Sequence, residues 1–285
     1  MAALQLTCES VLAQLDALPA FPRTVQRILA TVDDPESSMT DLANLVSHDP
    51  AIAARVYAAA HKAAAARDSS VVNLYAATSL IGMQAVREIA LYFSMSSFFE
   101  ELTDDLAQGA LWHHSVAVGV CAQELACHIS TKVSVHHAFI AGLLHDIGQF
   151  WLLRHSAQAS NACWRQCREK GIDICQAEES MFGVNHAVLG TWLVEAWGLP
   201  ASIASAVKGH HRPDAVKEVQ PLVNLVHVAE VLSNALELNG HTNVHVSYLS
   251  SRACHALGLT WDTSIHPLFG RIEARAEYMG SLLEP

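Results

Sequence analysis

Apolar residues recur at intervals of three and four positions along most of the chain, and alternating runs of β-branched residues are rare. This spacing places apolar side chains on one face of a helix, whereas a half-buried strand would show alternation. The pattern therefore predicts an all-α fold. Helices in the first hundred residues are expected to be short and bounded by prolines, and those after residue 110 are expected to be longer.

The N-terminal helices can be placed from their capping and breaking residues. A first helix is predicted to run to Leu18 and to end at Pro19, and a second to begin near Pro22. Ser38 or Thr40 is expected to cap the third helix, because a side-chain oxygen there can accept a hydrogen bond from the first turn. Another helix follows the Asp49-Pro50 step, and a further helix spans about 76–93 with an interruption at Gly82.

The acidic segment EELTDDLAQG then separates the short helices from the long ones. We interpret it as a surface connection and predict two packed helical subdomains, an N-terminal bundle over 1–108 and a second bundle with a C-terminal helical extension over 109–285. Within the second, the periodicity predicts helices over 111–129, 136–153, 157–170, 186–197, 203–211 and 222–238. Phe98 and Phe99, beside the acidic segment, are expected to form an interdomain seam or, as the alternative, an exposed partner patch.

Composition and charge narrow the function classes. The 17 Lys and Arg against 28 Asp and Glu give a net charge of −11, which argues against a nucleic-acid partner. With 51% apolar and 16% charged residues the chain can build a large core. Seven cysteines without a CxxC pair indicate reduced thiols, and neither a membrane span nor an export signal is evident. We therefore expect a cytoplasmic protein with no membrane partner.

The 17 histidines are the most unusual feature of the composition, and some of them stand in apolar segments. In AGLLHDIGQF, His145 and Asp146 are adjacent at the predicted end of a helix, and Gly148 offers a helix stop. At a helix end, an imidazole and a neighbouring carboxylate can reach one divalent ion. Four further histidines share the apolar setting: His114, His186, His210 and His211. A bound cation would remove the cost of burying such groups without partners.

The alternative is that the histidines are merely packed, each bonded to a backbone carbonyl or lying on a solvated helix face. We assign this interpretation to the remaining candidates, because they lie alone or beside a better-placed histidine: His48, His61, His113, His128, His137, His155, His241, His255 and His266. The positions of individual rings decide between a metal site and a helical scaffold.

The order of these motifs resembles the HD superfamily of metal-dependent phosphohydrolases. More closely, the chain resembles the signalling branch of that superfamily, the HDOD (HD-related output domain) proteins of bacteria, over roughly residues 15–235. The resemblance begins with LPAFPRTVQRILA, LVSHDPAIAARVYAAA and SLIGMQAVREIAL, and continues through AFIAGLLHDIGQF, FGVNHAVLGTWLVEAWGLP and VKGHHRP. It implies that the second subdomain is an HD-like bundle.

The resemblance also implies a site. It places seven residues around a common pocket as ligands of one or more divalent metal ions: His114, His145, Asp146, His186, His210, His211 and Glu230. Asp146 would be the catalytic residue of an active member. Iron, manganese, zinc and nickel all suit nitrogen and oxygen ligands of this kind. Whether one ion or two bind stays open.

Several departures from the active pattern count against catalysis. Diguanylate-degrading relatives follow the His-Asp motif with Lys, but this chain has Gln149, and HHRPDAVKEVQP lacks their Gly-Tyr-Pro signature. The family pattern has Asp where this chain has Glu230, which can still bind a metal. The only cations near the motifs are Arg154, Lys208 and Arg212. A large anionic substrate would need more cations than these three.

The leading hypothesis is therefore a bacterial signal-transduction output module with a retained metal-binding His/Asp site and no catalysis. The competing hypothesis is a metal-dependent phosphohydrolase acting on a phosphoester or nucleotide. A helical scaffold with packed histidines is the third. The expected partners are signalling proteins, a sensor or a response regulator, and a small phosphorylated ligand is an alternative input.

Overall fold

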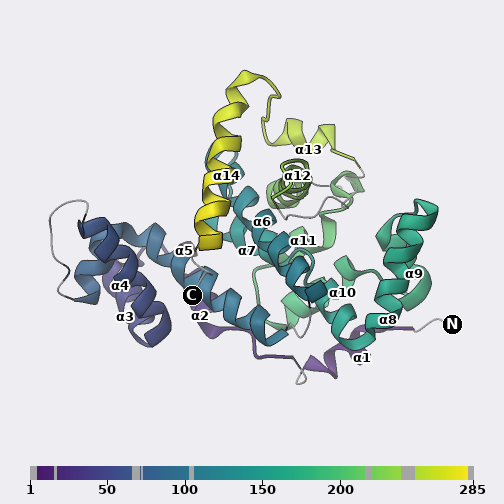
Figure 1. Ribbon diagram of the computed structural model, residues 1–285, viewed down its shortest axis with the longest axis horizontal. Coiled ribbons are helices and arrows are strands. Elements are labelled where there is room, and N and C mark those ends of the chain that lie inside the picture. Colours follow the sequence, from purple (N-terminus) through teal and green to yellow (C-terminus); the bar gives the residue numbers. More distant parts are fainter. Residues whose placement is uncertain are drawn as a thin grey trace. The chain divides into compact units, whose positions relative to one another are not determined.

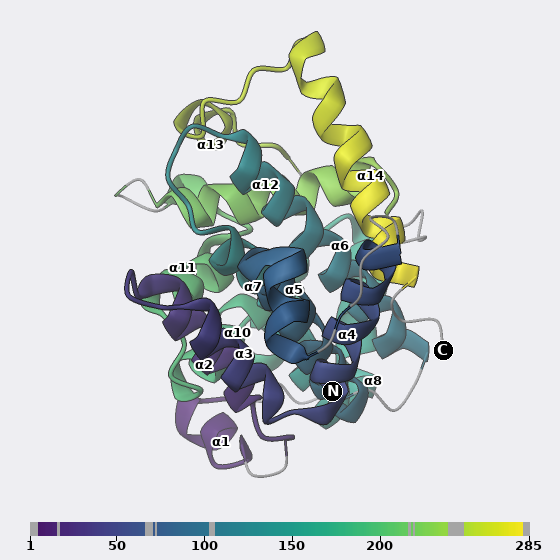
Figure 2. The ribbon, with the colours of Figure 1, turned by 90° about the vertical axis from the view of Figure 1, so that its left-hand side faces the viewer.

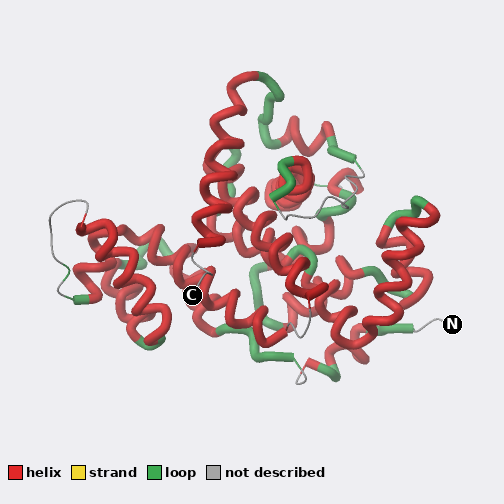
Figure 3. Tube along the Cα trace, in the orientation of Figure 1, coloured by secondary structure: helices red, strands yellow, loops and turns green. Residues whose placement is uncertain are grey.

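The protein is all-α in the computed structural model, which describes residues 5–15, 18–65, 71, 73–102, 106–215, 218, 220–238 and 248–281. Helices connected by loops make up these residues, and they include no strand (Figure 3). The predicted fold class is confirmed. The chain divides into two compact units, one spanning Pro19–Glu101 and the other formed by Met1–Leu18 together with Leu102–Pro285.

The smaller unit is a bundle in which α3 packs against α2 and α4 (Figure 2). Its helices are α2 (Arg23–Asp33), α3 (Met39–Ser47), α4 (Pro50–Ala65) and α5 (Leu74–Leu102). Of the two predicted caps, Ser38 is the one used: its hydroxyl accepts a hydrogen bond from the Asp41 amide at 3.2 Å, and the Asp41 carboxylate accepts from the Ser38 amide. This reciprocal arrangement satisfies two amides at the start of α3.

Gly82 interrupts α5 as the sequence predicts. Its φ of 86° and ψ of 157° belong to a region that is essentially restricted to glycine. The helix continues to Leu102, so the start of the acidic segment is helical and not a connection, while residues 103–105 lie outside the described residues. Phe98 and Phe99 are buried, and Phe98 meets the ring of Phe21 edge-on at 5.5 Å. An exposed partner patch at these phenylalanines is therefore wrong.

The larger unit carries the candidate site and is built around α6, which packs along α7, α12 and α14 (Figure 1). Helix α10 contacts α8 and α11 on the other side of the core. The helices are α1 (Cys8–Leu12), α6 (Leu106–His128), α7 (Val135–Leu144), α8 (Ile147–Lys170), α9 (Ile174–Phe182), α10 (His186–Ala196), α11 (Ala201–Gly209), α12 (Pro221–Ala235), α13 (Ser251–Ala256) and α14 (His266–Ser281). Among the described residues, no helix has the length and apolarity that crossing a membrane requires.

The predicted helix over 136–153 is two helices, and α8 continues through the next predicted helix with a kink at Ser156. Gly148 is not a helix stop, because it lies in the first turn of α8. A β-carbon on Gly148 would lie 2.1 Å from the carbonyl oxygen of His186. The glycine therefore allows α8 and α10 to approach closely, which brings Asp146 and His186 together.

Candidate metal centre

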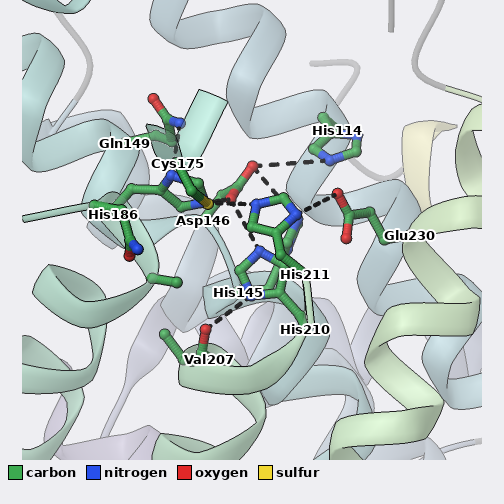
Figure 4. Close-up of polar contacts among 12 residues, drawn as sticks. His114, His145, Asp146, Gln149, Cys175, His186, Val207, His210, His211 and Glu230 are labelled. Atoms are coloured by element: carbon green, nitrogen blue, oxygen red, sulfur yellow. Dashed lines mark hydrogen bonds and ion pairs between the residues drawn. The ribbon is translucent and has the colours of Figure 1, made fainter. Parts of the chain in front are cut away.

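His145 and Asp146 lie at the junction between α7 and α8. His145 is the C-cap residue that follows α7, and Asp146 precedes α8 with a φ of −104° and a ψ of 18°. In a continuous helix two adjacent side chains would point about 100° apart. The break between the helices turns both toward the same space, where His145 Nε2 lies 3.4 Å from Asp146 Oδ2 (Figure 4).

The carboxylate of Asp146 lies at the centre of the cluster, and each of its oxygens faces two imidazole nitrogens (Figure 4). Oδ1 lies 3.2 Å from His186 Nε2 and 3.7 Å from His210 Nε2. Oδ2 faces His145 Nε2 and, at 3.9 Å, His114 Nε2. Residues from α6, α7, α10 and α11 thus converge on one carboxyl group.

Backbone carbonyls fix the orientation of two of these rings. The Nδ1–H of His145 donates to the carbonyl of Gly142 at 2.7 Å, and that of His210 donates to Val207 at 2.8 Å. Each histidine ends its helix and bonds to the carbonyl three residues earlier. Because a carbonyl can only accept, Nδ1 carries the proton, and in the neutral ring Nε2 has the lone pair.

Nε2 of His145, Nε2 of His210 and the carboxylate of Asp146 are consequently acceptors that meet at the centre. His145 Nε2, His210 Nε2 and Asp146 Oδ1 are buried, and none of them has a hydrogen bond to the described residues. Buried acceptors that face one another are unfavourable without a donor or a cation between them. Their chemistry fits a divalent metal, which accepts imidazole nitrogen and carboxylate oxygen together.

The structure brings all seven predicted site residues together in two adjoining groups. Within each group one potential ligand atom per residue lies within 4.8 Å of the others: Asp146, His186, His210 and His211 in one, and His114, His145 and Glu230 in the other. Glu230 joins the two, since its Oε1 lies 3.9 Å from His211 Nδ1. The buried cluster can hold metal, and the role of each residue as a ligand stays a prediction.

Glu178 is a component of the site that the sequence prediction missed. Its buried carboxylate contacts His186 Nδ1 at 2.6 Å and accepts the His186 amide at 2.8 Å. The side-chain amide of Gln149 donates to the other oxygen of Glu178 at 2.8 Å. A signal was present, because Glu178 lies three residues after Cys175 and four before Phe182, on the buried face of α9. That helix was not predicted.

Burial and neighbouring charge set the protonation of the cluster. Burial lowers the pKa of His114 to about 4 and that of His211 to about 3, so both rings are neutral at neutral pH. Burial by itself would lower the pKa of His186, but the adjacent carboxylate of Glu178 raises it well above the ordinary value. Burial also raises the pKa of Glu230 to about 8. The neutral rings of His114 and His211 thus have the lone pairs that a metal requires, whereas the ring of His186 must release a proton to bind one.

A cavity of about 350 Å³ opens beside the cluster and is lined by His114, Asp146, His186, His211 and Glu230. Its further wall comes largely from α8, through Gln149, Leu153, Asn161, Trp164 and Arg168. None of the three cations expected near the motifs lines this cavity. Arg168 does, although it lies twenty-two residues after the His-Asp pair.

His227 is a second missed residue, and it supports the cluster from behind. Its buried ring donates through Nδ1 to the carbonyl of His210 at 2.7 Å and accepts the amide of Ser250 at 3.1 Å. Among the histidines assigned no site role, His48 and His155 bond to carbonyls one turn earlier, those of Asn44 and Trp151. His241 lies outside the described residues.

The larger unit is thus an all-α bundle with a buried histidine and aspartate cluster that can hold metal. The HDOD domain matches residues 18–213, and the chain belongs to the HDOD family. A protein of Treponema pallidum (strain Nichols) without an assigned function is 21% identical over 80% of the chain, which spans 44% of that protein's length.

Three solved structures share the fold. An HDOD domain protein of unknown function from Geobacter sulfurreducens has a TM-score of 0.76 and 22% identity, over 95% of this chain and 97% of its own. A candidate signal transduction protein from Marinobacter aquaeolei VT8 has a TM-score of 0.73 and 20% identity, over 98% of this chain and 61% of its own. A candidate phosphohydrolase from Shewanella amazonensis SB2B has a TM-score of 0.64 and 20% identity, over 93% of this chain and 97% of its own.

Proposed function

We propose that this protein is a signal-transduction output module that binds divalent metal at its His/Asp cluster and does not catalyse hydrolysis. The observation that carries the metal proposal is the carboxylate of Asp146, each oxygen of which faces its own pair of imidazole nitrogens. With one oxygen directed at each pair, a carboxylate in this position can bind two metal ions at once. We therefore propose two ions, one held by Asp146, His186, His210 and His211, and the other by His114, His145 and Glu230, with Asp146 shared.

The surroundings of the cluster favour binding over turnover. Gln149 replaces a cationic residue of active relatives, and its amide nitrogen is committed to Glu178. It therefore offers neither a positive charge nor a proton to a phosphate. The Gly-Tyr-Pro signature is missing after His211. The fold is shared with a Marinobacter protein described as a candidate in signal transduction, which supports a signalling partner such as a sensor or a response regulator.

A metal-dependent phosphohydrolase is the second candidate, favoured by the complete set of ligands and by the cavity beside them. A Shewanella protein of the same fold is described as a candidate phosphohydrolase. A bound divalent metal supplies Lewis acidity and lowers the pKa of a coordinated water. In this case Asp146 would be the catalytic residue, orienting the reacting groups, and a small phosphoester would be the substrate.

Metal content separates the proposal from packed histidines. Protein purified without a histidine tag is titrated with Mn²⁺, Fe²⁺, Zn²⁺ and Ni²⁺ and its bound metal is measured. We expect up to two ions per chain, and their loss in His145→Ala and Asp146→Ala. His255→Ala, at an exposed histidine of α13, should retain them. A native protein that binds none of the four metals would overturn the proposal.

Turnover separates the two functions. The metal-loaded protein is assayed against phosphomonoesters, nucleotides and cyclic dinucleotides. We expect no hydrolysis above that of Asp146→Ala. A hydrolysis rate that is present in the native protein and absent from both His145→Ala and Asp146→Ala would establish the enzyme and overturn the non-catalytic module.

A further inference from the structure

The wall of the cavity formed by the second half of α8 has a chemical character of its own. Asn161, Trp164 and Arg168 are spaced three and four residues apart, so they lie on one face of the helix. The kink at Ser156 separates this face from Gln149 and Leu153, which line the cavity nearer the start of α8. One helix, α8, thus connects the His/Asp cluster to a face that carries an aromatic ring and a cation.

Trp164 is the aromatic group of this wall. The residue is 36% exposed, although most large apolar residues of the described chain are buried. It shares the cavity with the apolar side chains of Leu111, Leu153 and Ile174. An indole that lines a cavity beside aliphatic side chains is suited to pack against a flat ring, because offset stacking stabilises aromatic pairs beyond their burial.

Arg168 sets the charge that this cavity can accept. It is the only lysine or arginine among the described lining residues, and it makes no hydrogen bond or ion pair with the rest of the described chain. A single guanidinium can fork onto one phosphate group. In a chain of net charge −11, a ligand with several phosphates would lack partners. The volume of 350 Å³ also falls at the small end of ligand cavities, about 300–1,000 Å³.

We propose that the cavity binds a small phosphomonoester with a flat aromatic group, with its phosphate at the metal-loaded cluster and its ring against Trp164. Arg168 supplies the guanidinium that complements the anion. The inference rests on the proposed function, because the acceptor atoms of the cluster attract a phosphate only through bound metal. Trp164 and Arg168 are then the residues that select the ligand, whether the ligand is sensed or hydrolysed.

The test measures binding alone, so that turnover cannot confuse it. Mn²⁺-loaded full-length protein is titrated calorimetrically with benzylphosphonate, which has no ester bond, with methylphosphonate, which lacks the ring, and with benzyl alcohol, which lacks the anion. We expect benzylphosphonate to bind about tenfold more tightly than methylphosphonate, the ratio that corresponds to about 1.4 kcal/mol of ring packing. Benzyl alcohol should not bind.

Two variants assign the preference to α8. Trp164→Ala should bring the affinity for benzylphosphonate down to that for methylphosphonate, and Arg168→Gln should weaken both phosphonates alike. Trp261→Ala and Arg165→Gln are matched controls, since both side chains are exposed and neither lines the cavity. Neither control should change an affinity.

Three outcomes would overturn the inference. Equal affinity for the two phosphonates, or a ring preference that survives Trp164→Ala, would refute the role of the α8 face. Metal-loaded protein that binds no phosphonate would refute the ligand class while leaving the proposed metal site standing. Failure to load Mn²⁺ would refute the proposed function itself and this inference with it.

Discussion

Glu178 shows how one carboxylate can determine the properties of an imidazole that faces the cluster. It contacts Nδ1 of His186, so it holds the ring with Nε2 directed at Asp146. A carboxylate behind a ligating histidine orients the ring and makes it a stronger ligand. The arrangement predicts that metal affinity depends on a residue that does not touch the metal.

Substituting Glu178→Gln should weaken metal binding by about 10- to 100-fold, because the amide keeps the shape but loses the charge. The measurement is a competitive metal titration against a chelating dye, with circular dichroism to verify the fold. Glu179→Gln, at the next residue, is the matched control, since its side chain is exposed and bonds to Asn185. Equal affinities in the two variants would contradict the role of Glu178.

Gly148 makes a second prediction at the residue scale. Gly148→Ala would place a methyl group 2.1 Å from the His186 carbonyl oxygen, in backbone that cannot give way easily. Overpacking of this kind costs about 1–3 kcal/mol. The free energy of unfolding, measured in urea, should fall by that amount. Gly270→Ala in α14, where an added methyl meets nothing within 4 Å, should leave it unchanged or slightly higher.

Single residues were predictable from the sequence where they belong to a motif. The seven residues named from the histidine motifs and the family resemblance do converge. Glu178 and Arg168 were missed because each becomes visible only when the face of its own helix is known, and α9 was not predicted. Arg168 in addition lies after the kink of α8 at Ser156, and the apolar pattern does not indicate this kink.

At the scale of elements, α12 and α13 hold the end of α11 in place. The link is His227 of α12, which bonds on one side to the His210 carbonyl and on the other to the amide of Ser250, the cap of α13. The hydroxyl of Ser250 in turn donates to Asp214 at 2.8 Å. The backbone that carries His210 and His211 is therefore fixed from outside the cluster.

His227→Ala should lower both stability and metal affinity. It leaves a buried amide and a buried carbonyl without partners, each at a cost of about 1–3 kcal/mol. Urea unfolding measures the first effect and metal titration of the folded variant the second. His255→Ala, at an exposed position, is the control. A destabilised variant that retains full metal affinity would show that His227 is structural only.

Helix boundaries were predictable where a capping residue or glycine determines them, as at Ser38 and Gly82. The break between α7 and α8 lies at His145 and Asp146, before the predicted stop at Gly148, and the sequence hides it because apolar residues resume immediately after this pair. The short helix α9 was missed for a related reason: two glutamates fall within nine residues and obscure its buried face. Tertiary packing, which no local pattern reports, decides both cases.

At the scale of the whole larger unit, the C-terminal helix α14 is attached to α6, which carries His114. Arg271 donates from Nε to the largely buried carboxylate of Glu124 at 3.2 Å, and Arg275 Nε lies 3.8 Å from its other oxygen. Two helices separated by about 140 residues are thus connected through one side chain.

Glu124→Ala should reduce the free energy of unfolding by about 1 kcal/mol, because Arg271 is 46% exposed and can recover hydration. The difference from the native protein should shrink at high salt, which screens the pair. Glu273→Ala, on an exposed face of α14, serves as the control and should be neutral. A salt-independent loss would attribute the effect to packing instead.

The all-α class was predictable because the apolar period extends over nearly the whole chain. The division of the larger unit was harder to foresee: Met1–Leu18 belong with Leu102–Pro285, and the Leu6 amide donates to the Phe182 carbonyl at 2.8 Å. The apolar periodicity describes each helix separately. It does not indicate against which sequence-distant helix that helix packs.

The stretch that matches the HDOD family ends at residue 213, yet Glu230, His227 and Ser250 come later in the chain. A protein that kept the shared stretch and exchanged the tail would keep the five imidazoles and Asp146 but would have another residue, or none, in place of Glu230. Relatives with indistinguishable cores could therefore differ in how many ions they take up. The potential metal ligands of a family member therefore have to be identified over its whole chain, including the residues that follow the shared domain.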